Sequence, residues 1–151
     1  MGDPARHRVF ADFITERWPD RSLRIADVAG GHGQLNAELH RRGYRQVVTF
    51  DRRRGRWTDR PHYRYGEFHS GDAAEFDLLV GMHPDAATDV VLAASLDFGV
   101  PAAVVPCCAK PAAWPYAGRW GEEWVEHLER RSGALRAHLP INGAATVLVR
   151  P

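Results

Sequence analysis

A glycine-rich turn and a carboxylate further along the chain are the residues with the clearest chemical use. The turn, Asp27-Val28-Ala29-Gly30-Gly31-His32-Gly33, lies between a predicted strand and a predicted helix. Glycine allows backbone to approach a ligand closely, and the helix that follows directs free N–H groups and its positive end at the same place. Asp51 stands at the tip of the next predicted strand, where a carboxylate can accept hydrogen bonds from both hydroxyls of a ribose. These residues predict a nucleotide-type ligand.

Two alternatives to that ligand remain open on the residues alone. A nicotinamide cofactor requires Gly-x-Gly-x-x-Gly, and counting from Gly31 and Gly33 the third glycine position holds Asn36, which disfavours a dehydrogenase. The turn could also connect strand and helix without binding anything. The carboxylate of Asp51 at the second strand tip favours binding.

His83 and Asp85 follow a clear buried strand predicted over 76–82, and they are the candidate catalytic residues. Open parallel sheets bind ligands outside the carboxyl ends of their strands. His83 could remove a proton from a hydroxyl or amine nucleophile because its ordinary pKa is near 6.5, but a structural hydrogen bond is an equal alternative. For Asp85, capping the next helix is the favoured role.

Cys107 and Cys108 are the only cysteines and are adjacent in the chain. On a continuing strand they would point to opposite sides, so we expect two small buried residues and not a paired site. With His83 they supply too few ligands for zinc, and the sequence predicts no metal.

A basic loop and an aromatic segment are further candidates. Arg52-Arg53-Arg54, with Arg56 and Trp57, could grip phosphates and stack on a base, although a solvated loop is slightly favoured. A second set could wall the substrate side: Lys110, Trp114, Tyr116 and Trp120. The helical spacing of Trp120 and Trp124 places both more naturally in the core.

The elements that must position these residues follow from periodicity and turn signals. Helices are predicted over 5–18, 34–42, 85–96 and 119–131, and strands over 23–28, 46–50, 63–65, 76–82, 102–105, 135–139 and 144–150. Alternating strands and helices indicate a mainly parallel, doubly wound sheet with helices on both faces. Asn142-Gly143 predicts a hairpin between the last two strands.

The spacing Asp27, Ala29, Gly31, Gly33 and then Asp51 resembles the first two motifs of class I S-adenosylmethionine-dependent methyltransferases, with Ala29 in place of the first glycine. The resemblance implies S-adenosylmethionine as cofactor and a Rossmann-like, seven-stranded sheet with a C-terminal antiparallel hairpin. By this resemblance Asp27 lies near the cofactor's amino-acid portion, glycines floor its site and Asp51 holds the ribose. The predicted cofactor-binding residues are Asp27, Ala29, Gly30, Gly31, Gly33, Asp51, Arg52 and Met82.

A second resemblance covers His83, Thr88-Asp89 and Cys107-Cys108. These residues are similar to the methyltransferase-domain family that includes the tRNA acceptor-stem ribose methyltransferase, with Pro84-Asp85-Ala86 where that family has a Cys-Gly segment. The Asn/Asp-Pro-Pro-aromatic signature of amine-methylating enzymes is missing. The acceptor implied is an O or N nucleophile of RNA or of a small molecule.

A length of 151 residues suits one domain with one core, and the resemblance implies that residues 1–151 form a single minimal methyltransferase domain. Twenty basic and 19 acidic residues give a net charge of +1, which indicates neither a nucleic-acid nor a membrane partner. With no apolar run long enough for a bilayer and no secretory signal, we expect a cytoplasmic protein. A macromolecular substrate or a homodimer could complete the site. The alternative functions are an inactive cofactor-binding partner subunit and an RNA-binding module.

Overall fold

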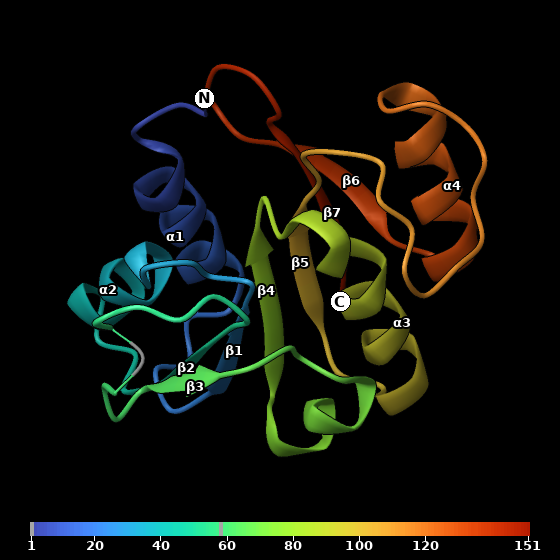
Figure 1. Ribbon diagram of the computed structural model, residues 1–151. Coiled ribbons are helices and arrows are strands. Elements are labelled where there is room, and N and C mark those ends of the chain that lie inside the picture. The colour runs from blue at the N-terminus through green and yellow to red at the C-terminus, as the bar shows by residue number, and fades with distance from the viewer. Residues whose placement is uncertain (1, 58) are drawn as a thin grey trace.

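The computed structural model describes residues 2–57 and 59–151, which form a single seven-stranded sheet with helices on both faces (Figure 1). The strands are β1 (Arg24–Val28), β2 (Gln46–Asp51), β3 (Tyr63–Tyr65), β4 (Leu78–Met82), β5 (Ala102–Val105), β6 (Leu135–His138) and β7 (Thr146–Arg150). The helices are α1 (Arg6–Arg17), α2 (Gln34–Arg41), α3 (Thr88–Phe98) and α4 (Glu122–Ser132), with short 3-10 turns η1 (Ser70–Glu75) and η2 (Asp85–Ala87). The sheet runs β3-β2-β1-β4-β5-β7-β6.

Only β7 runs against the other strands of this sheet. It pairs antiparallel with β5 on one side and with β6 on the other, whereas the remaining pairs are parallel. This arrangement confirms the predicted mainly parallel sheet with a C-terminal hairpin.

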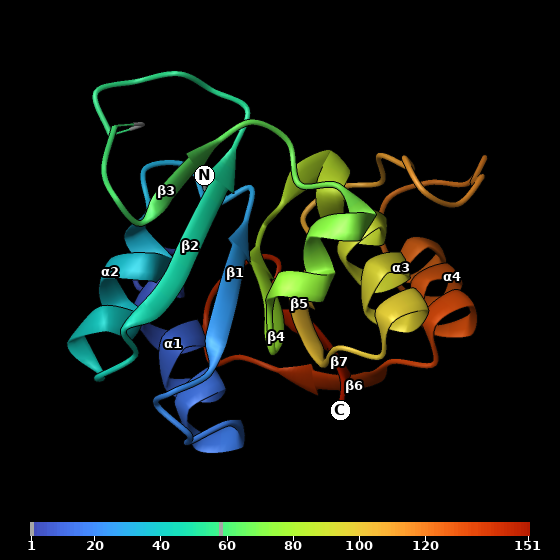
Figure 2. The ribbon, with the colours of Figure 1, turned by 90° about the horizontal axis from the view of Figure 1, so that it is seen from below.

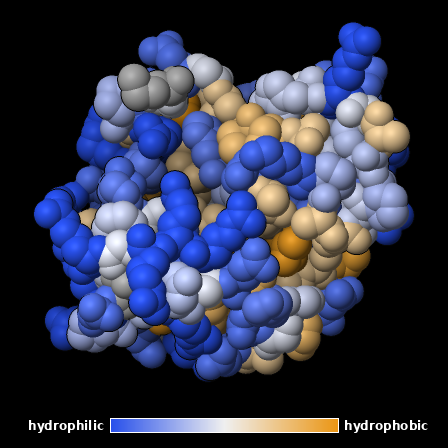
Figure 3. All heavy atoms as spheres, in the orientation of Figure 1, coloured by the Kyte–Doolittle hydropathy of each residue, from blue (hydrophilic) through white to orange (hydrophobic). Residues whose placement is uncertain are grey.

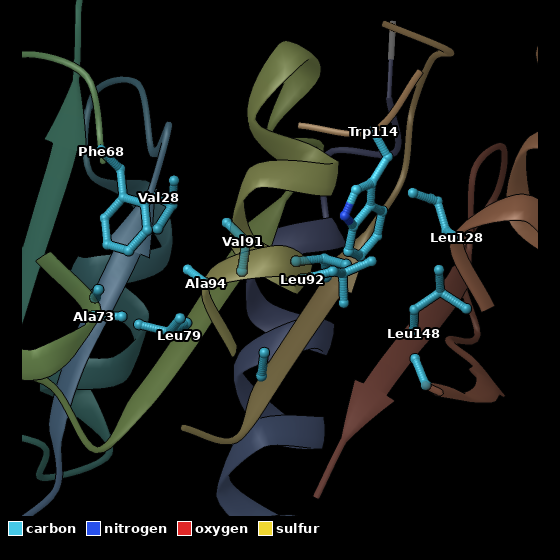
Figure 4. Packing of buried hydrophobic residues seen from close by; sticks show 14 of the residues in the cluster. Val28, Phe68, Ala73, Leu79, Val91, Leu92, Ala94, Trp114, Leu128 and Leu148 are labelled. Atoms are coloured by element: carbon cyan, nitrogen blue, oxygen red, sulfur yellow. The ribbon is translucent and has the colours of Figure 1, made fainter. Parts of the chain in front are cut away.

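The strands are apolar on both faces because helices cover both faces. On one face, Ile25 and Leu78 pack with Phe10 of α1 and Leu39 of α2. On the other face, α3 and α4 cover a second core, whose members include Val28, Leu79, Leu92, Leu128 and Leu148 (Figure 4). Figures 1 and 2 both place α1 and α2 on one side of the sheet and α3 and α4 on the other.

The strand order creates a crevice at one edge of the sheet. From β1 the chain moves outward to β2 and β3, then returns across β1 to build β4 and β5 on the opposite side (Figure 2). The carboxyl ends of these parallel strands meet at one edge, and the reversal between β1 and β4 is where open sheets of this kind bind ligands.

Several predicted boundaries differ from the observed ones. The helix expected over 85–96 is divided into η2 and α3. The helix expected from 119 begins at Glu122, so Trp120 precedes it and is 47% exposed, while Trp124 is fully buried. The core prediction is therefore confirmed for Trp124 and wrong for Trp120.

The two sides of the molecule differ in surface polarity. In Figure 3 apolar residues gather on the side of α3 and α4, and hydrophilic residues cover the side of α2. Exposed apolar side chains of α3 include Leu96 and Phe98. No helix formed by residues 2–57 or 59–151 has the length and apolar composition needed to cross a membrane.

Candidate functional site

A cavity of about 580 Å³ opens at the carboxyl edge of the sheet. Five predicted site residues line it: Ala29, Asp51, Arg52, His83 and Asp85. They come from the ends of β1, β2 and β4, so the topology brings together residues that lie far apart in sequence. The other predicted cofactor residues, Asp27, Gly30, Gly31, Gly33 and Met82, do not line it.

The glycine turn is held close to the ends of β1 and β2. Gly31 and Gly33 have φ angles of 59° and 81°, which glycine adopts without strain. Gly30 is required for space, because a Cβ there would lie 2.2 Å from Asp27 Oδ2 and 2.7 Å from Thr49 Cγ2. The Gly31 N–H donates to Asp51 Oδ2 at 2.8 Å. The turn therefore fixes the carboxylate of Asp51.

Asp27 lies beneath this turn and has no exposed surface. Thr49 Oγ1 donates to Asp27 Oδ2 at 2.8 Å, and Asn36 Nδ2 donates to Thr49 Oγ1 at 2.9 Å. Asp27 Oδ1 has no hydrogen-bond partner among the described residues. Burial raises the pKa of Asp27 to about 7, and the Thr49 hydroxyl offsets this only in part. Asp27 is thus a buried acid packed directly against the backbone of the turn at Gly30.

Asp51 closes the β2 side of the cavity and is 4% exposed. Its Oδ1 accepts from the Arg53 N–H at 2.8 Å and from Arg53 Nε at 3.2 Å. Its Oδ2 accepts from Gly31 and also from Arg53 Nη2 at 3.3 Å. Burial opposes ionisation, but the Arg53 and Gly31 hydrogen bonds together lower the pKa of Asp51 below its ordinary value. The group is a carboxylate at neutral pH.

Apolar side chains form the part of the cavity beyond Asp51. Phe50 and Phe68 meet edge to face with ring centroids 5.2 Å apart, and both line the cavity together with Val28. Figure 4 shows the Phe68 ring turned toward Val28. The sequence analysis missed Phe68 because the stretch after Asp51 has no periodicity; its aromatic character just beyond the weak strand β3 was the available signal.

His83 lies on the opposite side of the cavity and is half-buried. Its Nε2 is 2.9 Å from the carbonyl oxygen of Ala144. A carbonyl only accepts, so Nε2 carries the hydrogen and Nδ1 is the ring's acceptor. Burial lowers the pKa of His83, and the Ala144 contact offsets this only in part. His83 therefore makes a structural hydrogen bond and also presents a neutral imidazole beside the cavity.

Asp85 does not cap a helix through its side chain. The residue before α3 is Ala87 and the residue before η2 is Pro84, and neither α3 nor η2 has a side-chain cap. The Asp85 carboxylate instead accepts from Cys108 Sγ at 3.0 Å and pairs with Lys110 Nζ at 2.7 Å. The capping prediction is wrong because the backbone of Asp85 turns left-handed and directs the side chain toward the loop after β5.

Cys107 and Cys108 form one cluster, contrary to the expectation that they point apart. β5 ends at Val105, so strand alternation does not extend to the cysteines. Their sulfurs are 3.6 Å apart, both residues are half-buried, and Cys107 lines the cavity. Burial, with the Asp85 hydrogen bond, raises the pKa of Cys108 to about 12.

Asp89 has a role that the sequence analysis missed. Its fully buried carboxylate accepts the backbone N–H groups of Ala112, Ala113 and Trp114 at 2.9–3.2 Å. This contact fixes the loop after β5, including Ala112 on the cavity wall. Trp114 is buried in the α3–α4 core and does not wall the cavity, nor do Tyr116 and Trp120.

The arginines after β2 are occupied within the chain. Arg52 pairs with Glu67 at 3.4 Å, Arg53 pairs with Asp51, and Arg54 stacks on the Tyr65 ring. Arg52 and Arg53 also line the cavity, and both interpretations of this segment stay predictions.

Backbone strain is concentrated at the cavity. Ala29, His83 and Asp85 have φ angles of 54°, 52° and 54°, and they are the only non-glycine residues with positive φ among the described residues. All three line the cavity. A left-handed conformation costs a non-glycine residue about 1–2 kcal/mol, and such strain is typically found at functional sites.

Solved structures share this architecture. A methyltransferase from Aquifex aeolicus described as S-adenosylmethionine-dependent superposes with a TM-score of 0.58 at 10% identity, covering 97% of this chain and 92% of that one. The fold is that of S-adenosylmethionine-dependent methyltransferases. The glycopeptide N-methyltransferase MtfA, complexed with S-adenosylhomocysteine, gives 0.61 at 12% identity over 99% and 90% of the chains.

A third structure with the methyltransferase fold holds two bound molecules. The 1,6-didemethyltoxoflavin-N1-methyltransferase of Burkholderia thailandensis, with 1,6-didemethyltoxoflavin and S-adenosylhomocysteine bound, gives a TM-score of 0.56 at 16% identity, over 97% of this chain and 77% of that one. No protein-family model and no curated protein sequence matches the chain. At these identities the methyltransferase fold is shared, while the residues of the site are this chain's own.

Proposed function

We propose that this protein is an S-adenosylmethionine-dependent methyltransferase acting on an O or N nucleophile. The observation that supports this most directly is Asp51, an ionised carboxylate on the cavity wall, held at the tip of β2 by the glycine turn. The structural neighbours solved with S-adenosylhomocysteine support the choice of cofactor.

The hydrogen bonds of Asp51 match a ribose. A carboxylate has about four lone-pair sites. Backbone N–H groups of Gly31 and Arg53 occupy one site on each oxygen, and the Arg53 guanidinium occupies the other. The Arg53 side chain is 68% exposed, so it can swing into solvent and leave one acceptor site per oxygen for two vicinal hydroxyls. A cavity of about 580 Å³ is within the range of small-molecule sites.

The order of the strands then orients the ligand along the cavity. With the ribose at Asp51, the flat apolar surface for an adenine is that of Phe50 and Phe68. The other end, with His83 and Asp85, lies beyond β1 and faces the acceptor.

Methyl transfer requires few catalytic groups at the acceptor end of the cavity. S-adenosylmethionine supplies an electrophilic methyl group on a sulfonium, whose departure as a neutral thioether needs no acid. The protein must place the acceptor in line and remove a proton from it. We assign proton removal to Nδ1 of His83, which is neutral because burial lowers its pKa. Asp85 lies beside it and is held by Lys110.

Calorimetry with S-adenosylhomocysteine tests the proposed site. We expect Asp51→Ala to weaken binding at least about tenfold, because two hydrogen bonds to a charged group are lost. We expect Arg53→Ala to bind as tightly as the wild type or more tightly, because it frees the same carboxylate. Asp97→Ala, at an exposed position of α3, is the matched control. Equal affinities of Asp51→Ala and Asp97→Ala would mean that Asp51 does not hold the ligand.

Two further assays separate the other functions. Labelled methyl transfer into metabolite or RNA pools distinguishes an enzyme from an inactive cofactor-binding subunit. An RNA-binding module requires RNA affinity that falls with Arg53→Ala and with rising salt.

A further inference from the structure

Three potential metal ligands meet at the acceptor end of the cavity. They are Asp85, from the turn after β4, and Cys107 and Cys108, from the loop after β5. Their donor atoms all lie within 4.8 Å of one another. The sequence analysis weighed the cysteines with His83 and found too few ligands, because nothing in the sequence places Asp85 beside them.

The distances are close to those of a tetrahedral site. With Zn–S bonds of about 2.3 Å, two sulfurs of one tetrahedron lie about 3.8 Å apart, and the two cysteine sulfurs are 3.6 Å apart. A sulfur and a carboxylate oxygen of such a site lie about 3.5 Å apart, whereas Cys108 Sγ and Asp85 Oδ1 are 3.0 Å apart. The Asp85 side chain is 44% exposed and can make this small adjustment by rotation.

The donor set and its charge suit a thiophilic divalent ion. Thiolate sulfur selects zinc over magnesium or calcium. Each cysteine loses its proton to solvent when the metal binds, so two thiolates, one carboxylate and Zn²⁺ carry a net charge of −1. Lys110, whose Nζ is 2.7 Å from Asp85 Oδ1, supplies the balancing positive charge.

We propose that Cys107, Cys108 and Asp85 bind one Zn²⁺ ion. Three protein ligands leave a fourth position open, which is the pattern of catalytic zinc sites. Asp85 and Cys107 both line the cavity, so an ion held by them would lie at the cavity wall. The site stands on its own donors and is independent of the proposed methyl transfer. Where both proposals hold, an acceptor oxygen or nitrogen bound at the open position loses its proton more readily.

Cobalt titration of the reduced, chelator-treated full chain tests the proposal. Co²⁺ replaces Zn²⁺ and reports thiolate ligands through a sulfur-to-metal charge-transfer band. We expect one equivalent to bind, with the band abolished when Zn²⁺ is added. Cys107→Ser and Cys108→Ser should each abolish the band, and Asp85→Asn should raise the dissociation constant at least tenfold. Asp97→Asn should behave as the wild type.

A second measurement avoids the possibility that the cysteine variants do not fold. In the wild-type protein, Zn²⁺ should slow alkylation of both cysteines at least tenfold, and excess chelator should restore the rate. No charge-transfer band at one equivalent, unprotected cysteines, or a dissociation constant unchanged in Asp85→Asn would each overturn the proposal. S-adenosylhomocysteine binding by the same metal-free protein is scored separately, so failure of either proposal leaves the other measurable.

Discussion

At the residue scale, two carboxylates adjoin the same glycine turn, and their surroundings move their pKa values in opposite directions. Burial raises the pKa of Asp27 to about 7, whereas hydrogen bonds from Arg53 and Gly31 outweigh burial and lower that of Asp51. Neighbouring carboxylates whose pKa values are shifted in opposite directions are typical of sites in which the two acids have different roles. Here the deeper acid lies beneath the turn, and the outer acid lies on the cavity wall, where we propose that it holds the ribose.

The raised pKa of Asp27 makes stability depend on pH. A folded pKa above the unfolded one means that the native state binds the proton more tightly, so this contribution is complete below about pH 4 and is lost as the pH rises toward 7. We expect the free energy of unfolding of the wild type, relative to Asp27→Asn, to fall across this range and then level off.

Urea denaturation at a series of pH values measures that difference. Thr49→Val removes the hydroxyl that lowers the pKa of Asp27. In this variant the fall in the free energy of unfolding should therefore extend to higher pH. A difference that is constant with pH, or that grows as the pH rises, would show that Asp27 is not the buried acid responsible.

Residue identity alone predicted some of the site and not the rest. Asp51 and Gly31 were predictable because a strand, a glycine turn, a helix and a strand are all recognisable from local patterns. The cluster of Asp85 with Cys107 and Cys108 was not, because it depends on a left-handed Asp85 and on β5 ending at Val105. The left-handed backbone of Asp85 has no local sequence signal, and the strand end predicted at 105 does not determine how the two cysteines after it are directed.

At the scale of elements, α3 holds the loop after β5 through one buried side chain. Asp89 accepts the N–H groups of Ala112, Ala113 and Trp114. The partners are separated by more than 20 positions in the sequence, so the position of Asp89 in the first turn of α3 was predictable and its contacts were not.

We expect Asp89→Asn to destabilise the protein by about 3 kcal/mol, because a buried acceptor of charge-assisted hydrogen bonds is replaced by an amide that also carries donors. Urea denaturation gives the total effect. Hydrogen exchange should show lost protection at Ala112 to Trp114 in particular. Asp97→Asn lies on the same helix in an exposed position and should change neither. A loss of stability in Asp89→Asn no larger than in Asp97→Asn would refute the anchoring role.

The long segment between β2 and β4 shows where element prediction fails. Only β3, Tyr63–Tyr65, was predicted there, and η1, Ser70–Glu75, was not. Residues of this segment pack through individual contacts, such as that between Phe68 and Phe50 of β2. Contacts of this kind produce no apolar periodicity in the sequence. As a result, the apolar part of the cavity was absent from the predicted site.

At the scale of the whole molecule, the sheet order places the cavity at the carboxyl ends of β1 and β4, where the chain leaves these two paired strands toward opposite sides of the sheet. Alternating elements predicted a doubly wound sheet, and the strand order β3-β2-β1-β4-β5-β7-β6 confirms it. The fold predicts where a ligand binds but not which acceptor is methylated. A homodimer and a cytoplasmic location stay predictions.

The most direct test of the central claim is a crystal structure of the chain with S-adenosylhomocysteine. We predict the ribose hydroxyls on the two oxygens of Asp51, the Arg53 guanidinium displaced into solvent, and the adenine against Phe68. The sulfur should face the end of the cavity that holds His83. A ligand bound elsewhere, or Asp51 still covered by Arg53 at saturating ligand, would contradict the account.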